Sequence, residues 1–238
     1  MAVLGNGIAT DIAKRIESQV LESIGNLGAH LNGQPSDSQF LKLSAHRLSL
    51  SLTWLYALRP LGQFRYRPNS KGVLSAPRTQ IRYGDVWIRI LEKGVACTRP
   101  LPDWLAMELH AHHARLMLYR GPAGRVKTQM LNTGLPLFPA NRINGSGRWQ
   151  TSQLSNWPEE LRDFQRQHKL RNNFIRQACQ ARLLSNGITE TESSSWLRHD
   201  GNPDSPDWAQ AMGGLQTLDR PYQYLVQGLK SAWSSTQN

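Results

Sequence analysis

Hydrophobic residues recur at every fourth position near the start of the chain. The residues with this spacing are Ile8, Ile12, Ile16, Val20 and Ile24. Residues four apart lie on one face of an α-helix, so the pattern predicts an amphipathic helix over residues 8–25. Gly25 and Gly28 are expected to end this helix.

A second helix is predicted from Ser38 to about Leu58. Within it, leucines at positions 48, 50 and 52 alternate with serines, which is a pattern typical of a strand. However, the segment contains no Gly or Pro and is much longer than an average strand of ~5–6 residues. Its length therefore favours a helix.

Residues 78–99 have the clearest strand pattern in the chain. Three segments, 78–83, 86–91 and 95–99, are separated by Gly84-Asp85 and by Glu92-Lys93-Gly94. Both separators are typical of hairpin turns, of two and three residues respectively. The pattern predicts three antiparallel strands, with Tyr83 opposite Val86 and Arg82 opposite Trp87.

Alternation along these strands separates two faces of the predicted sheet. The apolar face, expected to join the core, contains Thr79, Ile81, Tyr83, Val86, Ile88 and Ile90. The other face contains Arg78, Gln80, Arg82, Trp87, Arg89 and, across the second turn, Arg99. Arginines contact phosphates and Trp stacks on bases, so this face predicts a nucleic-acid site. The alternative is a solvated face whose Trp packs under a helix, but such a face normally also carries acidic residues.

The remaining pattern is mostly helical. Helices are predicted over 102–119, 157–186, 207–216 and 220–234, with a capping box at Asn156 and Glu159 and a stop at Asn186-Gly187. Arg162, Arg166, Lys169 and Arg176 share one face of the 157–186 helix, either as a phosphate-binding stripe or, more commonly, as a solvated face. A short strand is predicted over 126–131, and 141–156 is predicted as a loop or linker. We therefore expect a mainly helical α+β fold with a small antiparallel sheet, organised as a basic core (1–156) and a C-terminal helical region (157–238).

The charge is concentrated in the middle of the chain. The net charge is +11 over 238 residues, but residues 42–158 alone carry 17 basic and four acidic residues. The first 41 residues are slightly acidic, and residues 159–238 are balanced. A local positive field of this kind is typical of proteins that bind a polyanion.

Two basic loop regions extend the predicted nucleic-acid site. The Pro- and Gly-rich segment 59–77 contains Arg65, Arg67 and Lys71, with Phe64 and Tyr66 interleaved with the two arginines. In the segment 120–155, the candidate residues are Arg120, Arg125, Lys127 and Arg148. The Gly121–Gly124 segment has the GxxG spacing of a backbone-clamping loop, but a surface turn explains it more simply.

Three histidines on the 102–119 helix raise a catalytic alternative. His110 and His113 share one face, and Glu108 and His112 share another, so each pair supplies two ligands and leaves a metal site incomplete. His112 continues the apolar stripe of Leu105 and Leu109, which indicates a histidine at the edge of the core. His110 or His113 could act as general acid or base in a nuclease.

No segment resembles a phosphate-binding P-loop or a serine nucleophile elbow. We therefore expect no metal or other cofactor. Two distant cysteines, no signal-peptide pattern and no apolar run of membrane-spanning length predict a cytoplasmic protein. The favoured function is a non-catalytic nucleic-acid-binding subunit of a larger nucleoprotein complex, with RNA or DNA and other protein subunits as partners. An adaptor for an acidic protein is a further alternative.

Overall fold

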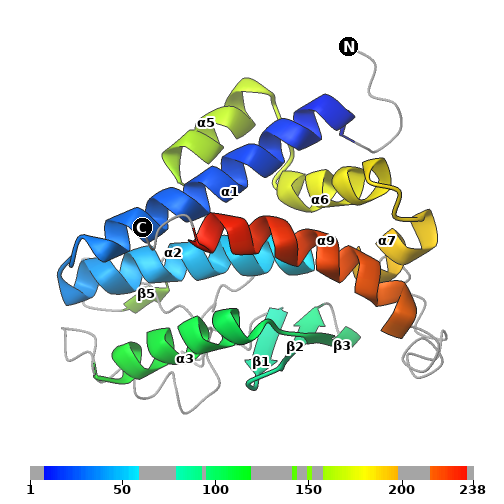
Figure 1. Ribbon diagram of the computed structural model, residues 1–238. Coiled ribbons are helices and arrows are strands. Elements are labelled where there is room, and N and C mark those ends of the chain that lie inside the picture. Colours follow the sequence, from blue (N-terminus) through cyan, green and yellow to red (C-terminus); the bar gives the residue numbers. More distant parts are fainter. Residues whose placement is uncertain are drawn as a thin grey trace, which may run out of the picture. The chain divides into compact units, whose positions relative to one another are not determined.

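The computed structural model describes residues 8–58, 79–92, 95–118, 141–143, 149–151, 158–197 and 215–234. Over these residues the chain is mainly helical with antiparallel strands, which confirms the predicted α+β class (Figure 1). The helices are α1 (Thr10–Asn32), α2 (Asp37–Tyr56), α3 (Asp103–Leu118), α5 (Glu159–Gln167), α6 (Phe174–Ser185), α7 (Glu190–Leu197) and α9 (Leu215–Ser234). The strands are β1 (Thr79–Tyr83), β2 (Trp87–Glu92), β3 (Val95–Pro100), β4 (Asn141–Ile143) and β5 (Trp149–Thr151).

The chain divides into two compact units. The first unit comprises Met1–Ala29, Ser49–Pro60 and Trp157–Asn238. The second unit comprises His30–Leu48 and Leu61–Asn156.

The core of the first unit is built around the second half of α2. Every residue from Ser49 to Leu58 is buried, the serines as well as the leucines. A helix that is buried on all sides needs no polar face, which explains why leucine and serine alternate here without forming a strand. The predicted second helix is therefore confirmed.

Buried side chains hydrogen-bond to the carbonyl end of α2. The last carbonyls of a helix have no partner within the helix, and a buried carbonyl is costly to leave unpaired. Arg176 Nη1 donates to the Ala57 carbonyl at 2.7 Å, and Trp196 Nε1 donates to the Leu55 carbonyl at 2.9 Å. Arg176 also donates to the Leu197 carbonyl at the end of α7, so one guanidinium joins two helix ends.

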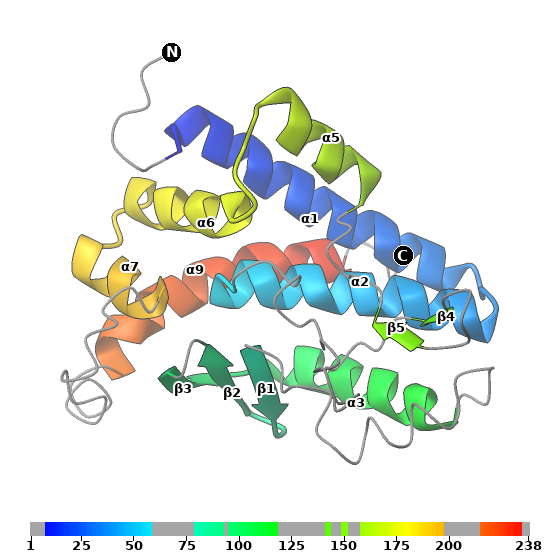
Figure 2. The ribbon, with the colours of Figure 1, turned by 180° about the vertical axis from the view of Figure 1, so that it is seen from behind.

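Helix α9 runs beside α2 in both views of the molecule (Figures 1 and 2). Its buried residues recur every fourth position, at Pro221, Leu225, Leu229 and Trp233, and Trp233 Nε1 donates to Ser51 Oγ at 3.1 Å. The prediction of a break before residue 220 is wrong, because this continuous stripe carries the helix through Pro221. Residues 207–214 lie outside the described part of the chain.

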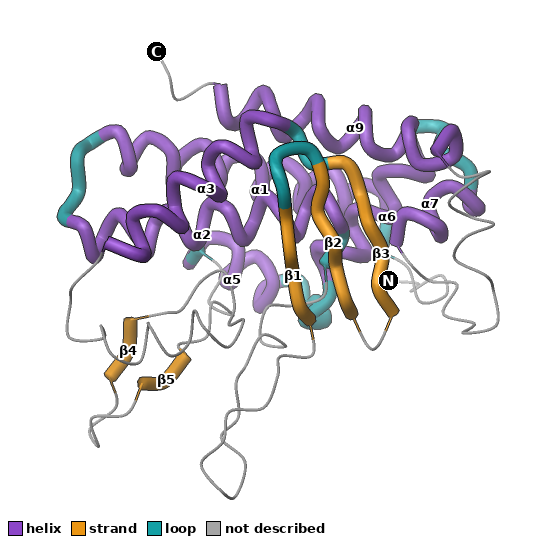
Figure 3. The backbone as a smooth tube through the Cα atoms, turned by 90° about the horizontal axis from the view of Figure 1, so that it is seen from below, coloured by secondary structure: helices purple, strands orange, loops and turns teal. Residues whose placement is uncertain are grey.

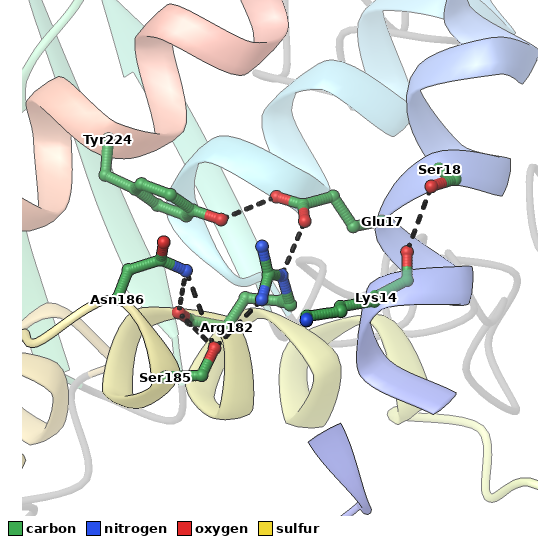
Figure 4. A network of polar contacts seen from close by, with 7 residues as sticks. All are labelled: Lys14, Glu17, Ser18, Arg182, Ser185, Asn186 and Tyr224. Atoms are coloured by element: carbon green, nitrogen blue, oxygen red, sulfur yellow. Dashed lines mark hydrogen bonds and ion pairs between the residues drawn. The ribbon is translucent and has the colours of Figure 1, made fainter. Parts of the chain in front are cut away.

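A polar network ties α1, α6 and α9 together at the edge of this core (Figure 4). Arg182 Nε donates to one carboxylate oxygen of Glu17 at 2.5 Å, and Tyr224 Oη donates to the other at 2.9 Å. Burial and the negative charge of Glu17 raise the pKa of Tyr224 to about 12, so its hydroxyl remains a donor at neutral pH. The carboxylate of Glu17 thereby holds α6 and α9 against α1, although the three helices are far apart in the sequence.

The predicted helix over 157–186 is wrong as a single element. Helix α5 ends at Gln167, Lys169 adopts a left-handed backbone conformation with φ of 49°, and α6 begins at Phe174. Phe164 before the break and Phe174 after it are both buried. Arg176 is buried in α6, so it does not belong to an exposed stripe with Arg162 and Arg166. The predicted stop is confirmed, with Asn186 as C-cap and Gly187 at φ 77°.

Other helix boundaries also differ from the prediction. α1 continues to Asn32 because Leu27 and Gly28 are buried in its packed face, so the glycines do not end it. The N-cap of α5 is Pro158, with no side-chain capping bond, instead of the predicted capping box. The short helix α7 lies between the predicted helices over 157–186 and 207–216, where the sequence predicts no helix.

The second unit packs α3 against the three-stranded sheet and the first half of α2. The strand order is β1–β2–β3 (Figure 3). Its buried apolar residues include Leu41, Ala45 and Leu48 of α2, Ile88 and Ile90 of β2, and Leu105 and Leu109 of α3. β4 and β5 form a separate antiparallel pair (Figure 3) in the segment predicted as a loop. The predicted strand over 126–131 lies outside the described residues.

Because Arg176 donates to carbonyls at the ends of both α2 and α7, we predict that Arg176→Met strongly lowers the free energy of unfolding. The substitution keeps the volume but removes the donor from two buried carbonyls, so we expect a loss of about 2–4 kcal/mol of unfolding free energy. Urea denaturation monitored by circular dichroism measures it. The matched control is Arg171→Met, because Arg171 is exposed. Equal stability of the two variants would contradict the role given to Arg176.

Candidate nucleic-acid interface

The candidate interface is the face of the β1–β2–β3 sheet that points away from the core, here called the outward face. Ile88 and Ile90 are fully buried, while Trp87 is 41% exposed and Arg89 is exposed. This alternation along β2 confirms the predicted separation into two faces. Directly opposite residues of antiparallel strands share a face, and Arg82 lies opposite Arg89 in the register.

The outward face has no acidic residue at its described positions. The residues placed on it by the register are Gln80, Arg82, Trp87, Arg89, Leu91, Ala96, Thr98 and Pro100. The nearest acidic residue of the hairpin, Asp85, lies in its turn and pairs with His110 of α3, with Oδ1 and Nε2 3.1 Å apart. The described positions of this face therefore offer no anionic group to its positive charge.

The first hairpin turn lies one residue later than predicted. Gly84 N donates to the Trp87 carbonyl at 2.9 Å, which leaves Asp85 and Val86 at the tip. Tyr83 therefore pairs with Ile88 in place of Val86, and Arg82 pairs with Arg89 in place of Trp87. Moving the turn by one residue shifts the pairing by two, so the strand faces are unchanged. Val86 alone leaves the predicted core face and is 63% exposed.

Arg99 is not on the outward face, which corrects the prediction. Glu92 pairs with Val95, so the second turn has two residues between paired positions and not three. A shift of one residue moves every side chain of a strand to the other face. Arg99 consequently lies opposite Ile88 and is half-buried, while Thr98 lies opposite Arg89.

Trp87 is positioned by the absence of a side chain at Gly84. A Cβ added to Gly84 would lie 2.4 Å from the indole Nε1 of Trp87, well inside contact distance. Gly84 has no positive φ, so this position requires glycine for space and not for backbone conformation. The indole packs on the Gly84 backbone and remains partly exposed, as a base-stacking surface requires.

Tyr83 of β1 and His113 of α3 form a polar cluster beside the hairpin that the sequence pattern does not predict. Tyr83 Oη lies 2.6 Å from His113 Nδ1 and 3.2 Å from the Leu109 carbonyl. Burial raises the pKa of Tyr83 to about 12. Burial, followed by the nearby His110, lowers the pKa of His113. The cluster thus holds a neutral tyrosine against a neutral histidine at pH 7.

His112 belongs to the core. Its Nδ1 lies 3.0 Å from Ser44 Oγ of α2 and the residue is buried, which confirms the interpretation as a core-edge histidine. Within the described ranges, no group of three or more His, Cys, Asp or Glu residues is placed to hold a metal ion.

The remaining predicted site residues lie outside the described residues. These are Arg65, Arg67, Lys71, Arg78, Arg120, Arg125, Lys127 and Arg148. Arg82 is described by its backbone register alone. The structure therefore brings together the positions of Arg82, Trp87 and Arg89, and the register of β3 places Arg99 on the opposite face.

Comparison with known proteins adds no relative: the chain matches no protein-family model, no curated protein and no solved structure. None of the helices in the described ranges is both long enough and apolar enough to cross a membrane.

The contact between Trp87 and Gly84 predicts that Gly84→Ala displaces the indole. The added methyl group occupies the space of Nε1, so we expect the Trp87 indole N–H signal to shift in a ¹⁵N–¹H spectrum and stability to fall by about 1–3 kcal/mol. Gly33→Ala is the matched control, because its nearest neighbour is the His30 carbonyl at an ordinary 3.4 Å. An unshifted Trp87 signal in Gly84→Ala would contradict this packing.

Proposed function

We propose that the protein binds nucleic acid with the outward face of the β1–β2–β3 sheet. The observation that carries the proposal is the grouping on this face of Arg89, the Arg82 position opposite it, and the exposed Trp87, with no acidic residue among them. Guanidinium groups bind phosphates through charge-assisted hydrogen bonds. Such contacts provide affinity without reading the base sequence.

The indole of Trp87 favours an unpaired strand as the ligand. Bases are exposed for stacking only where they are not stacked in a duplex, and a base on an aromatic side chain contributes about 1–3 kcal/mol. Phosphate contacts from the flanking arginines would hold the backbone of the same strand. Binding is therefore expected to be largely independent of sequence.

The proposed role is a non-catalytic subunit of a larger cytoplasmic nucleoprotein complex. RNA-guided effectors and the machinery of plasmids or other mobile elements are complexes that use such subunits. The supporting features are the eight Trp residues and the strongly basic middle of the chain, because aromatic residues are enriched in surfaces that other subunits cover.

The double variant Arg82→Ala/Arg89→Ala tests the proposed face. Each phosphate contact contributes roughly 0.7–0.9 to the slope of log affinity against log salt, so the slope should become shallower by about 1.5. Fluorescence anisotropy with a labelled single-stranded oligonucleotide, titrated at several salt concentrations, measures this. Trp87→Ala should weaken single-strand binding with little change in slope.

The control for total charge is Lys14→Ala/Lys230→Ala. Both lysines are exposed and belong to the first unit, and the variant loses the same two charges. We expect its slope to stay close to that of the wild type. A slope that drops equally in both double variants would assign binding to the overall charge and not to the outward face.

A second candidate function is phosphodiester cleavage with His110 as general base. The observation that favours it is the His110–Asp85 pair at the tip of the same hairpin, because a carboxylate orients and stabilises a catalytic imidazole. End-labelled RNA and DNA, incubated with and without divalent metal, would then be cut by the wild type and left intact by His110→Ala. His30→Ala, at an exposed histidine of α1, should keep any such activity. Intact substrate with the wild type would exclude cleavage and leave binding unaffected.

A further inference from the structure

Helix α3 has an apolar stripe on the side opposite the core. Leu105, Leu109 and His112 are buried on its inner side. The outer stripe consists of Met107, Ala111, Ala114 and Leu118, all exposed, with Met107 71% and Leu118 77% exposed. A surface helix normally has polar residues on its outer side. An exposed apolar row of this kind indicates an interaction surface.

The spacing of the outer stripe is that of a helix-pairing seam. Its residues are separated by four, three and four positions, which is the alternation of the two inward positions in a coiled coil. The two central residues are alanines, and small side chains let two helix backbones approach closely. The two end residues are large and apolar, and the unbranched Met107 can adapt its shape to a facing helix.

The charges beside the stripe determine which helix fits it. Glu108 and Arg115 lie on the same flank of the stripe, two helical turns apart, and both are exposed. In an antiparallel pair related by a two-fold axis, the same flank of each helix faces its counterpart. In a parallel pair, the flank with Glu108 and Arg115 would instead face the flank that contains His110. Only the antiparallel pair therefore places Glu108 and Arg115 of the two copies on the same side.

A two-fold axis between Ala111 and Ala114 matches the whole stripe to itself. Met107 then packs against Leu118 of the second copy, and Ala111 packs against its Ala114. Glu108 lies roughly 3 Å along the helix axis from Arg115 of the second copy, from a rise of 1.5 Å per residue. The axis repeats each of these contacts, so both Glu108 and both Arg115 gain a partner of opposite charge.

We propose that α3 pairs in antiparallel fashion with α3 of a second copy of this chain. This inference does not depend on nucleic-acid binding, because the stripe and the outward face of the sheet share no residue. The surface of one helix is smaller than the ~1,200 Å² of a standard stable interface, so we expect a weak dimer with a micromolar or higher dissociation constant.

Both flanking charges also have neighbours within their own chain. The Arg115 guanidinium stacks on the ring of Phe40, with its central carbon 3.8 Å from the ring centroid, which leaves its N–H groups available at the ring edge. The negative charge of Glu108 partly offsets the burial that lowers the pKa of Arg47 to about 10. Stability therefore has to be measured for each charge variant.

Sedimentation velocity on nuclease-treated protein, up to about 1 mM, tests the dimer over the micromolar range of dissociation constants. We expect the wild type to dimerise and Met107→Glu/Leu118→Glu to be monomeric. The control is Leu184→Glu, an exposed leucine of α6, which should dimerise like the wild type. Circular dichroism checks that each variant is folded.

A charge swap separates the antiparallel pair from other contacts. Arg115→Glu places two acidic residues opposite each other and should weaken the dimer by at least ~5-fold. Adding Glu108→Arg restores opposite charges and should recover the wild-type dissociation constant. A monomeric wild type, a dimer that persists in Met107→Glu/Leu118→Glu, or a folded double swap without recovery would each overturn the proposal. None of these results bears on binding to nucleic acid.

Discussion

The fold of the first unit depends on one constraint, the need to hydrogen-bond the carbonyl end of a helix that is buried on all sides. α2 ends among apolar residues, where water cannot pair with its last carbonyls. Arg176 of α6 and Trp196 of α7 donate to them, and Cys179 Sγ lies 3.7 Å from the Trp54 carbonyl. These donors come from elements that follow α2 by more than a hundred residues. The buried end of α2 is therefore stable only when α6 and α7 are packed against it and supply these donors.

The elements with a regular hydrophobic period could be predicted, but several of their ends could not. The stripes of α1 and α3 and the alternation of β1 and β2 depend on local spacing alone. By contrast, α1 passes through two glycines because its face is packed, and α9 passes through Pro221 for the same reason. The break at Lys169 lies between two phenylalanines that are both buried. Where these helices end depends on contacts with residues far away in the sequence. The hydrophobic period along the chain carries no information about such contacts.

The candidate site shows how a face can be predicted correctly while a neighbour is misplaced. An error of one residue in the position of the first turn preserved the faces, so Arg82, Trp87 and Arg89 remain together. An error of one residue in the length of the second turn moved Arg99 to the other side. The tyrosine–histidine contact and the role of Gly84 depend on how α3 and the indole pack. The spacing of residues along the sequence predicts neither the tyrosine–histidine contact nor the role of Gly84.

The close packing of Trp87 on Gly84 also has a consequence for dynamics. The Gly84 amide donates to the Trp87 carbonyl at the base of the turn, while the indole covers the same glycine. The backbone bond and the ring contact therefore join the same two residues at the base of the turn. Amide hydrogen exchange at Gly84 would report how often this hydrogen bond opens. The free energy of that local opening sets the fraction of time for which the turn is closed.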